Sequence, residues 1–193
     1  MSVLVLGLVL FLGVHSVRIF AESWRTRQIA RLGEKGWKGA YSVVSAVGLV
    51  LIIWGYGIAR RDPVVLWAPP VWAPHLAALL TLIAFIFFLA AYVPGNHFKA
   101  WVKHPQALSV GFWAFAHLLA NGTLADVLLF GGFLGWAVAD RISLKRRSTP
   151  QLPRSAPPRS WNDALAVTLG VAIYALFIGW AHLRLFGVSP LDF

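Results

Sequence analysis

Long apolar stretches separated by short basic segments constrain this chain more than any other feature of its sequence. Six such stretches are present: Val3–Ile19, Ala40–Ala59, Pro74–Val93, Gln106–Asn121, Leu124–Ala139 and Ala164–Leu185. A helix that crosses a bilayer needs about 20 mainly apolar residues, within a range of roughly 17 to 25. Only 12% of the 193 residues are charged, whereas a soluble domain carries about 25%. The sequence therefore predicts an all-α fold, a single polytopic membrane domain of about six transmembrane helices over residues 1–193.

The fourth and fifth stretches are the shortest, and only Asn121-Gly122-Thr123 separates them. A tight helical hairpin and a partly re-entrant pair both fit that spacing. The hairpin is favoured, because Asn-Gly between two apolar runs is a turn signal.

Lys and Arg residues gather on one side of these spans. The loops after the first, third and fifth spans hold Arg18, Arg25, Arg27, Arg31, Lys35, Lys38, Lys99, Lys103, Arg141, Lys145, Arg146, Arg147, Arg154 and Arg159. The opposite side holds Arg60, Arg61 and Arg184. Because cytoplasmic loops are enriched in Lys and Arg, the sequence predicts the first set inside the cytoplasm and both termini outside it. This topology explains the net charge of +10 without a nucleic-acid partner.

Two weaker signals lie in the second half of the chain. Residues 141–162 combine basic residues with four prolines and predict a flexible cytoplasmic loop, with contact to anionic lipid as an alternative role. Gly131 and Gly135 form a small-residue motif that is typical of close helix contacts and of homo-oligomers in membranes.

Histidines are the strongest candidates for chemistry. The chain has no cysteine, which excludes thiolate nucleophiles and iron–sulfur clusters. His15 lies within the first span and His117 within the fourth, where polar side chains are costly and are often functional. Neutral imidazole is a common metal ligand, and two imidazoles can hold a heme iron. For either residue alone, the competing interpretation is a hydrogen-bonded packing residue. A zinc site is disfavoured because no second inward carboxylate accompanies these histidines.

Helical spacing suggests neighbours for both histidines. Asn121 follows His117 by one turn and is a candidate to orient its imidazole. Arg18 follows His15 by about one turn and is a candidate to bind a heme propionate. The alternative for Arg18 is an i,i+4 ion pair with Glu22.

Depth in the membrane bears on which histidines pair. At a rise of about 1.5 Å per residue, His15 lies roughly 7 Å from the cytoplasmic edge and His117 roughly 18 Å from it. Two axial ligands of one iron need similar depth. His104, immediately before Pro105, therefore stays open as the partner of His15.

Two motifs resemble those of a known family. They are Lys103-His104-Pro105-Gln106 followed by Ala116-His117-Leu118-Leu119-Ala120-Asn121-Gly122, and His15-Ser16-x-Arg18 at the end of the first span. They resemble the NnrU family of bacterial membrane proteins over nearly the whole chain. That family is associated with denitrification and is similar to ζ-carotene isomerase, a membrane enzyme that binds heme b.

The resemblance implies a multi-pass protein of the bacterial inner membrane with heme b as cofactor. It implies His15 and His117 as the axial pair, with His104 a further motif position. It also implies a redox or isomerase role on a lipophilic small molecule. A non-enzymatic membrane factor that supports nitrogen-oxide reductases is the other class left open.

A second resemblance points to a different chemistry. Lys103-His104-Pro105 at the start of a helix is similar to the Arg-His-Pro motif of membrane methyltransferases that bind S-adenosylmethionine. This chain lacks the Tyr of that motif, and no Glu follows Glu34. The sequence therefore predicts that methyl transfer is the weaker alternative.

Overall fold

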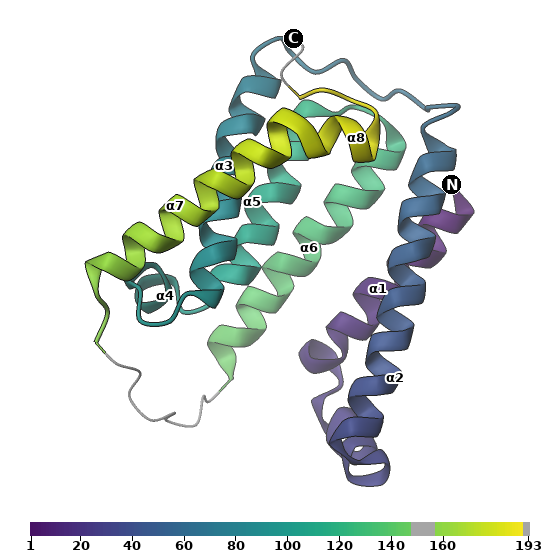
Figure 1. Cartoon of the computed structure of the whole chain (residues 1–193). Coiled ribbons are helices and arrows are strands. Elements are labelled where there is room, and N and C mark those ends of the chain that lie inside the picture. Colours follow the sequence, from purple (N-terminus) through teal and green to yellow (C-terminus); the bar gives the residue numbers. More distant parts are fainter. Residues whose placement is uncertain (148–156, 191–193) are drawn as a thin grey trace. The chain divides into compact units, whose positions relative to one another are not determined.

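The computed structural model describes residues 1–147 and 157–190, and these are predominantly helical (Figure 1). The elements are α1 (Ser2–Phe20), α2 (Glu22–Ala59), α3 (Ala73–Tyr92), α4 (His97–Val102), α5 (Pro105–Ala120), α6 (Leu124–Arg146), α7 (Ser160–Leu176), the π-helix η1 (Phe177–Ala181) and α8 (His182–Phe186). They confirm the predicted all-α fold. The chain divides into two compact units, each described by itself below. Unit 1 is Met1–Ala68 with Gly122–Asp140, and unit 2 is Pro69–Asn121 with Arg141–Phe193.

Five helical segments of the described residues are long and apolar enough to cross a membrane. They are Ser2–Phe20, Glu22–Ala59, Ala73–Tyr92, Leu124–Arg146 and Ser160–Phe186. These segments confirm the prediction of a polytopic membrane protein. The remaining predicted span is α5, whose 16 residues extend about 24 Å. That is less than the roughly 30 Å of a bilayer core, so the count of six and the side of the termini stay predictions.

Three helix ends lie several residues outside the predicted apolar stretches. Helix α2 begins at Glu22, so much of the basic segment after α1 is helical rather than a loop. Gly33 interrupts α2 with φ 71°, a conformation that glycine adopts without a side-chain clash. Helix α6 continues through Arg146 and α7 begins at Ser160, which shortens the predicted loop 141–162 at both ends. Residues 148–156 of that loop lie outside the described residues.

Unit 1 is built on a glycine-mediated contact between α1 and α2, which lie side by side and antiparallel (Figure 1). A Cβ added at Gly48 would lie 2.8 Å from the backbone nitrogen of Phe11. A Cβ added at Gly55 would collide with the backbone of Leu4. Small residues let helix backbones approach closely in a membrane, where lipid tails give no hydrophobic drive for association.

The predicted small-residue motif of α6 is not one of these tight contacts. A Cβ added at Gly131 or Gly135 would meet nothing within 4 Å in the described part of the chain. Homo-oligomer formation through these two glycines stays a prediction. The glycine of α6 that does face a neighbour is Gly132, whose added Cβ would lie 3.3 Å from the Leu12 side chain.

The first turn of α6 is fixed by a buried carboxylate in unit 1. Asp126 is 3% exposed and accepts hydrogen bonds from the backbone N–H and the hydroxyl of Thr123. The Tyr56 hydroxyl donates to its other oxygen at 2.5 Å. Thr123-x-x-Asp126 has the spacing of a capping box, which satisfies helix N–H groups that would otherwise lack partners. Asp126 is therefore a structural residue that ties α6 to α2.

Unit 2 is organised around α3, which packs against α5 and α7 (Figure 1). Its buried positions are small: Ala73, Ala77, Ala84 and Ala90. Gly170 of α7 faces the backbone of Ile86, with 2.8 Å from an added Cβ to the Ile86 Cα. The Tyr174 hydroxyl donates to the Ala78 carbonyl at 3.0 Å. Small side chains and one interhelical hydrogen bond thus hold α7 on α3.

Candidate functional site

His15 lies in an aromatic setting within unit 1, which we call the His15 cluster: Phe11, His15, Tyr41 and Trp136. The imidazole stacks on Phe11 with ring centroids 4.2 Å apart. It lies 5.2 Å from the Tyr41 ring and 6.1 Å from the Trp136 ring, which meets it edge-on at 88°. These three residues come from α1, α2 and α6, so every helix of unit 1 contributes to the surroundings of His15.

The tautomer of His15 follows from its one ring hydrogen bond. Nδ1 lies 2.7 Å from the carbonyl oxygen of Phe11, one turn earlier in α1. A carbonyl oxygen only accepts, so Nδ1 carries the proton and Nε2 of the neutral ring keeps its lone pair. A backbone carbonyl on one ring nitrogen is the usual support for a histidine that binds metal through the other.

His117 repeats this arrangement in unit 2. It lies in the last turn of α5, and its Nδ1 is 2.8 Å from the carbonyl oxygen of Trp113. The same argument places the proton on Nδ1 and a lone pair on Nε2. The Trp113 ring lies 5.2 Å from the imidazole. Both histidines that the sequence ranks highest are therefore half-buried, with the proton on Nδ1 and the lone pair on Nε2.

His104 stands at the other end of the same helix. It is the N-cap residue of α5, followed directly by Pro105. His104 and His117 thus occupy opposite ends of α5 within unit 2. His15 belongs to unit 1, so the pairing of His15 with either of them stays a prediction.

The two residues predicted to assist these histidines have other contacts in the structure. The Asn121 side-chain amide donates to the backbone carbonyl of His117 at 2.8 Å, while the Trp113 carbonyl holds the ring. Arg18 Nε lies 3.9 Å from Glu22 Oε2, the i,i+4 ion pair that was the alternative to propionate binding. Its side chain is 60% exposed.

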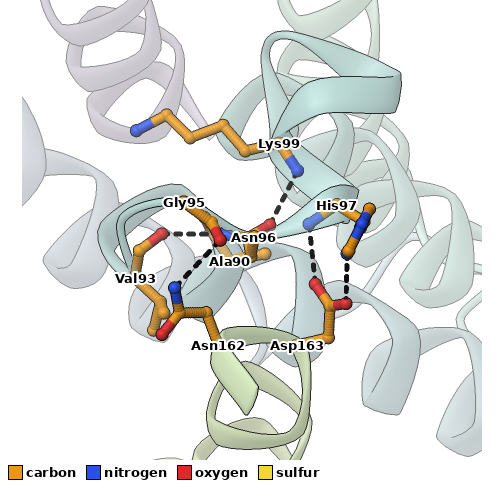
Figure 2. A network of polar contacts seen from close by, with 8 residues as sticks. All are labelled: Ala90, Val93, Gly95, Asn96, His97, Lys99, Asn162 and Asp163. Atoms are coloured by element: carbon orange, nitrogen blue, oxygen red, sulfur yellow. Dashed lines mark hydrogen bonds and ion pairs between the residues drawn. The ribbon is translucent and has the colours of Figure 1, made fainter. Parts of the chain in front are cut away.

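A second polar cluster joins α3, α4 and α7 in unit 2 (Figure 2). We call it the Asn96 network: Gly95, Asn96, His97, Asn162 and Asp163. Asn96 is 2% exposed and donates to the carbonyls of Ala90 and Val93 at the end of α3. Its side-chain oxygen accepts from the backbone N–H of Lys99 at 2.7 Å and caps α4.

Asp163 closes the other half of the Asn96 network (Figure 2). One carboxylate oxygen accepts from the backbone N–H of His97 at 2.6 Å, and the other lies 2.6 Å from His97 Nδ1. Asn162 donates to the carbonyl of Gly95 at 2.9 Å. The start of α7 is thereby fastened to the segment between α3 and α4.

Sequence reasoning missed the partners of these histidines that lie far away along the chain. Tyr41 and Trp136 lie beside His15, and Asp163 binds His97, yet each is far from its partner along the chain. Only Thr123-x-x-Asp126 carried a local signal, the capping-box spacing.

Among the described residues, no group of three or more His, Asp or Glu side chains is placed to hold a metal ion. A bis-histidine heme site needs only two protein ligands.

Comparison with known families gives one match that spans both units. The family model described as NnrU protein matches residues 3–190. No curated protein and no solved structure matches the chain. The matched range contains His15, His104 and His117 and every described helix from α2 to α8, with all but the first residue of α1.

Proposed function

Since this chain belongs to the NnrU protein family, we propose that it is a heme b-binding protein of the bacterial inner membrane, with His15 and a histidine of α5 as axial ligands. His117 ranks above His104. Bound heme supplies redox chemistry or Lewis acidity at its iron, and we propose that it serves a redox or isomerase reaction on a lipophilic substrate, linked to denitrification.

The observation that supports this proposal is the shared state of His15 and His117. Each imidazole donates Nδ1–H to the carbonyl four residues earlier, at 2.7 Å and 2.8 Å. Each therefore keeps a lone pair on Nε2, the atom that binds iron. His182 also has Nδ1 near a carbonyl, that of Val188 at 2.7 Å, but this contact is exposed and lies at the C-terminal end of the segment Ser160–Phe186. His182 is thus a matched control.

The chain's own residues define what such a site would do. Phe11, Tyr41 and Trp136 surround His15 with rings that exclude water and favour a flat apolar cofactor. The Phe11 and Trp113 carbonyls fix the orientation of the two imidazoles and increase their basicity as ligands.

The test is the absorption spectrum of the full chain purified in mild detergent from heme-replete cells. We expect a low-spin heme b spectrum, with one heme per chain in the pyridine hemochromogen assay. His15→Ala and His117→Ala should each lose heme or shift it to high spin, whereas His182→Ala should match the wild type. Loss in His15→Ala and His104→Ala with an unchanged His117→Ala would keep heme and make His104 the partner. An unaltered low-spin spectrum in His15→Ala would overturn the proposal.

A further inference from the structure

The basic segment between the first two predicted spans folds as a short helix, residues 22–32, which we call the 22–32 helix. Ala21 separates it from α1, with φ −137° and ψ 40°. Gly33, with φ 71° and ψ 165°, separates it from the rest of α2. The Trp24 ring meets the Trp37 ring edge-on, with centroids 5.7 Å apart. This contact fastens the 22–32 helix to the part of α2 that follows Gly33.

The 22–32 helix begins at the level where the α1 span ends. Helices α1 and α2 are antiparallel, and Gly48 meets Phe11 (Figure 1). Phe20 lies as far beyond Phe11 as Gly39 lies before Gly48, so the last residue of α1 is level with Gly39. Phe20 is 78% exposed and Trp24 is 44% exposed. Aromatic rings at the end of a span lie at the depth of the lipid headgroups, which places the start of the 22–32 helix at the membrane surface.

The cations of residues 18–38 divide into those with a carboxylate partner and those without one. The two carboxylates of this segment are Glu22 and Glu34. Their partners, at 3.9, 2.8 and 3.2 Å, are Arg18, Arg25 and Lys38. The exposed cations that make no ion pair in the described part of the chain are Arg27, Arg31 and Lys35. Positive charge is therefore left uncompensated on the 22–32 helix.

The uncompensated charge shares one face with an aromatic ring. Arg27 follows Trp24 by three residues and Arg31 follows Arg27 by four, so all three exposed side chains lie along one side of the 22–32 helix. A guanidinium binds phosphate through two parallel hydrogen bonds, and an indole ring is favoured among headgroups. The bias of Lys and Arg toward cytoplasmic loops accounts for the number of cations, but it does not require unpaired arginines to share a face with a tryptophan.

We propose that this face of the 22–32 helix binds an anionic phospholipid. Arg27 and Arg31 hold the headgroup phosphate, and Trp24 lies in the headgroup layer beside it. The bilayer is favoured over a soluble acidic partner because the face adjoins the end of a membrane span. Binding here does not depend on heme.

The experiment measures which lipid lies beside the 22–32 helix. The chain has no cysteine, so Ser23→Cys gives a single labelling site, exposed and one turn before Arg27. The full chain carries a fluorophore there and is reconstituted in phosphatidylcholine vesicles. Quenching by spin-labelled phosphatidylglycerol is compared with quenching by spin-labelled phosphatidylcholine. We expect a local preference of about fivefold for phosphatidylglycerol, the effect of one cation near an anionic headgroup. The preference should disappear at about 1 M salt, where the screening length is about 3 Å.

Paired substitutions separate this face from net charge. Arg27→Gln with Arg31→Gln should reduce the preference to within about twofold. The matched control is Arg61→Gln with Arg184→Gln, which removes the same charge from two exposed arginines on the opposite side of the predicted topology. It should keep the full preference. Heme content should be the same in the wild type and both pairs, so this proposal and the proposed function fail independently.

Three outcomes would overturn the proposal. Equal quenching by the two lipids in the wild type would mean that the face is merely solvated. A loss in the control pair as large as in the test pair would mean that net charge, rather than this face, sets the preference. No quenching by either lipid would place the 22–32 helix away from the bilayer and leave its face to a soluble partner.

Discussion

The Asn96 network and the His15 cluster each hold a histidine by Nδ1, yet they differ in whether all of their buried polar groups have hydrogen-bond partners. In the Asn96 network the acceptors lie within the protein: both oxygens of Asp163 bind His97, and the amide of Asn96 binds three backbone groups. In the His15 cluster, Trp136 Nε1 is buried and has no hydrogen-bond partner among the described residues.

A polar cluster whose groups satisfy one another fastens helices together and needs no ligand. A buried donor without a partner instead leaves a hydrogen bond unmade and carries a desolvation cost. His97 is therefore assigned to the stability of unit 2, whereas ligand binding at His15 stays a proposal.

The largest expected effect is on the Asn96 network. Asn96→Ala removes three hydrogen bonds from a residue that is 2% exposed and leaves the carbonyls of Ala90 and Val93 without this partner. We expect a loss of about 2–4 kcal/mol in the free energy of unfolding, measured by denaturation in detergent micelles. Asn162→Ala removes one described bond, to Gly95, and should cost only about 1 kcal/mol. Equal losses in both variants would contradict the central role of Asn96.

A smaller effect is expected where α1 meets α2 beside the His15 cluster. Gly48→Ala places a Cβ 2.8 Å from the Phe11 nitrogen, and the Phe11 carbonyl is the acceptor for His15. We expect a loss of about 1–3 kcal/mol from overpacking, together with weaker heme retention.

Gly57→Ala, on the same helix, is the control for Gly48→Ala. A Cβ at Gly57 meets nothing within 4 Å, so this variant should gain about 0.5–1 kcal/mol from helix propensity. The comparison is made on thermal unfolding of the two variants and on their heme content. If Gly48→Ala is as stable as Gly57→Ala and retains as much heme, then α1 and α2 are not in close contact at this level.

These regions also show how far the sequence alone could lead. Apolar length predicted α1 as Val3–Ile19, and the structure has Ser2–Phe20, because burial in lipid depends on local composition. The segment from Glu22 carries charges, so hydropathy gave no signal for its helix. Position inside apolar spans selected His15 and His117 as candidates, and their role as heme ligands stays a proposal. The contacts of His15 with Trp136 and of His97 with Asp163 join distant helices, and no local pattern encodes which helices pack together.

The smallest expected effect is the sharpest test of the comparison. In the heme-free chain, Trp136 Nε1 has no described hydrogen-bond partner to lose. Removing a buried polar group that lacks a partner relieves its desolvation penalty, whereas removing a paired one leaves a partner exposed to that penalty. Trp136→Phe keeps an aromatic ring beside His15. We therefore expect the free energy of unfolding of the heme-free chain to change by less than about 0.5 kcal/mol in this variant, or to rise slightly. A loss above about 1 kcal/mol would show that the indole N–H is already satisfied by the protein, and the His15 cluster would then be as self-contained as the Asn96 network.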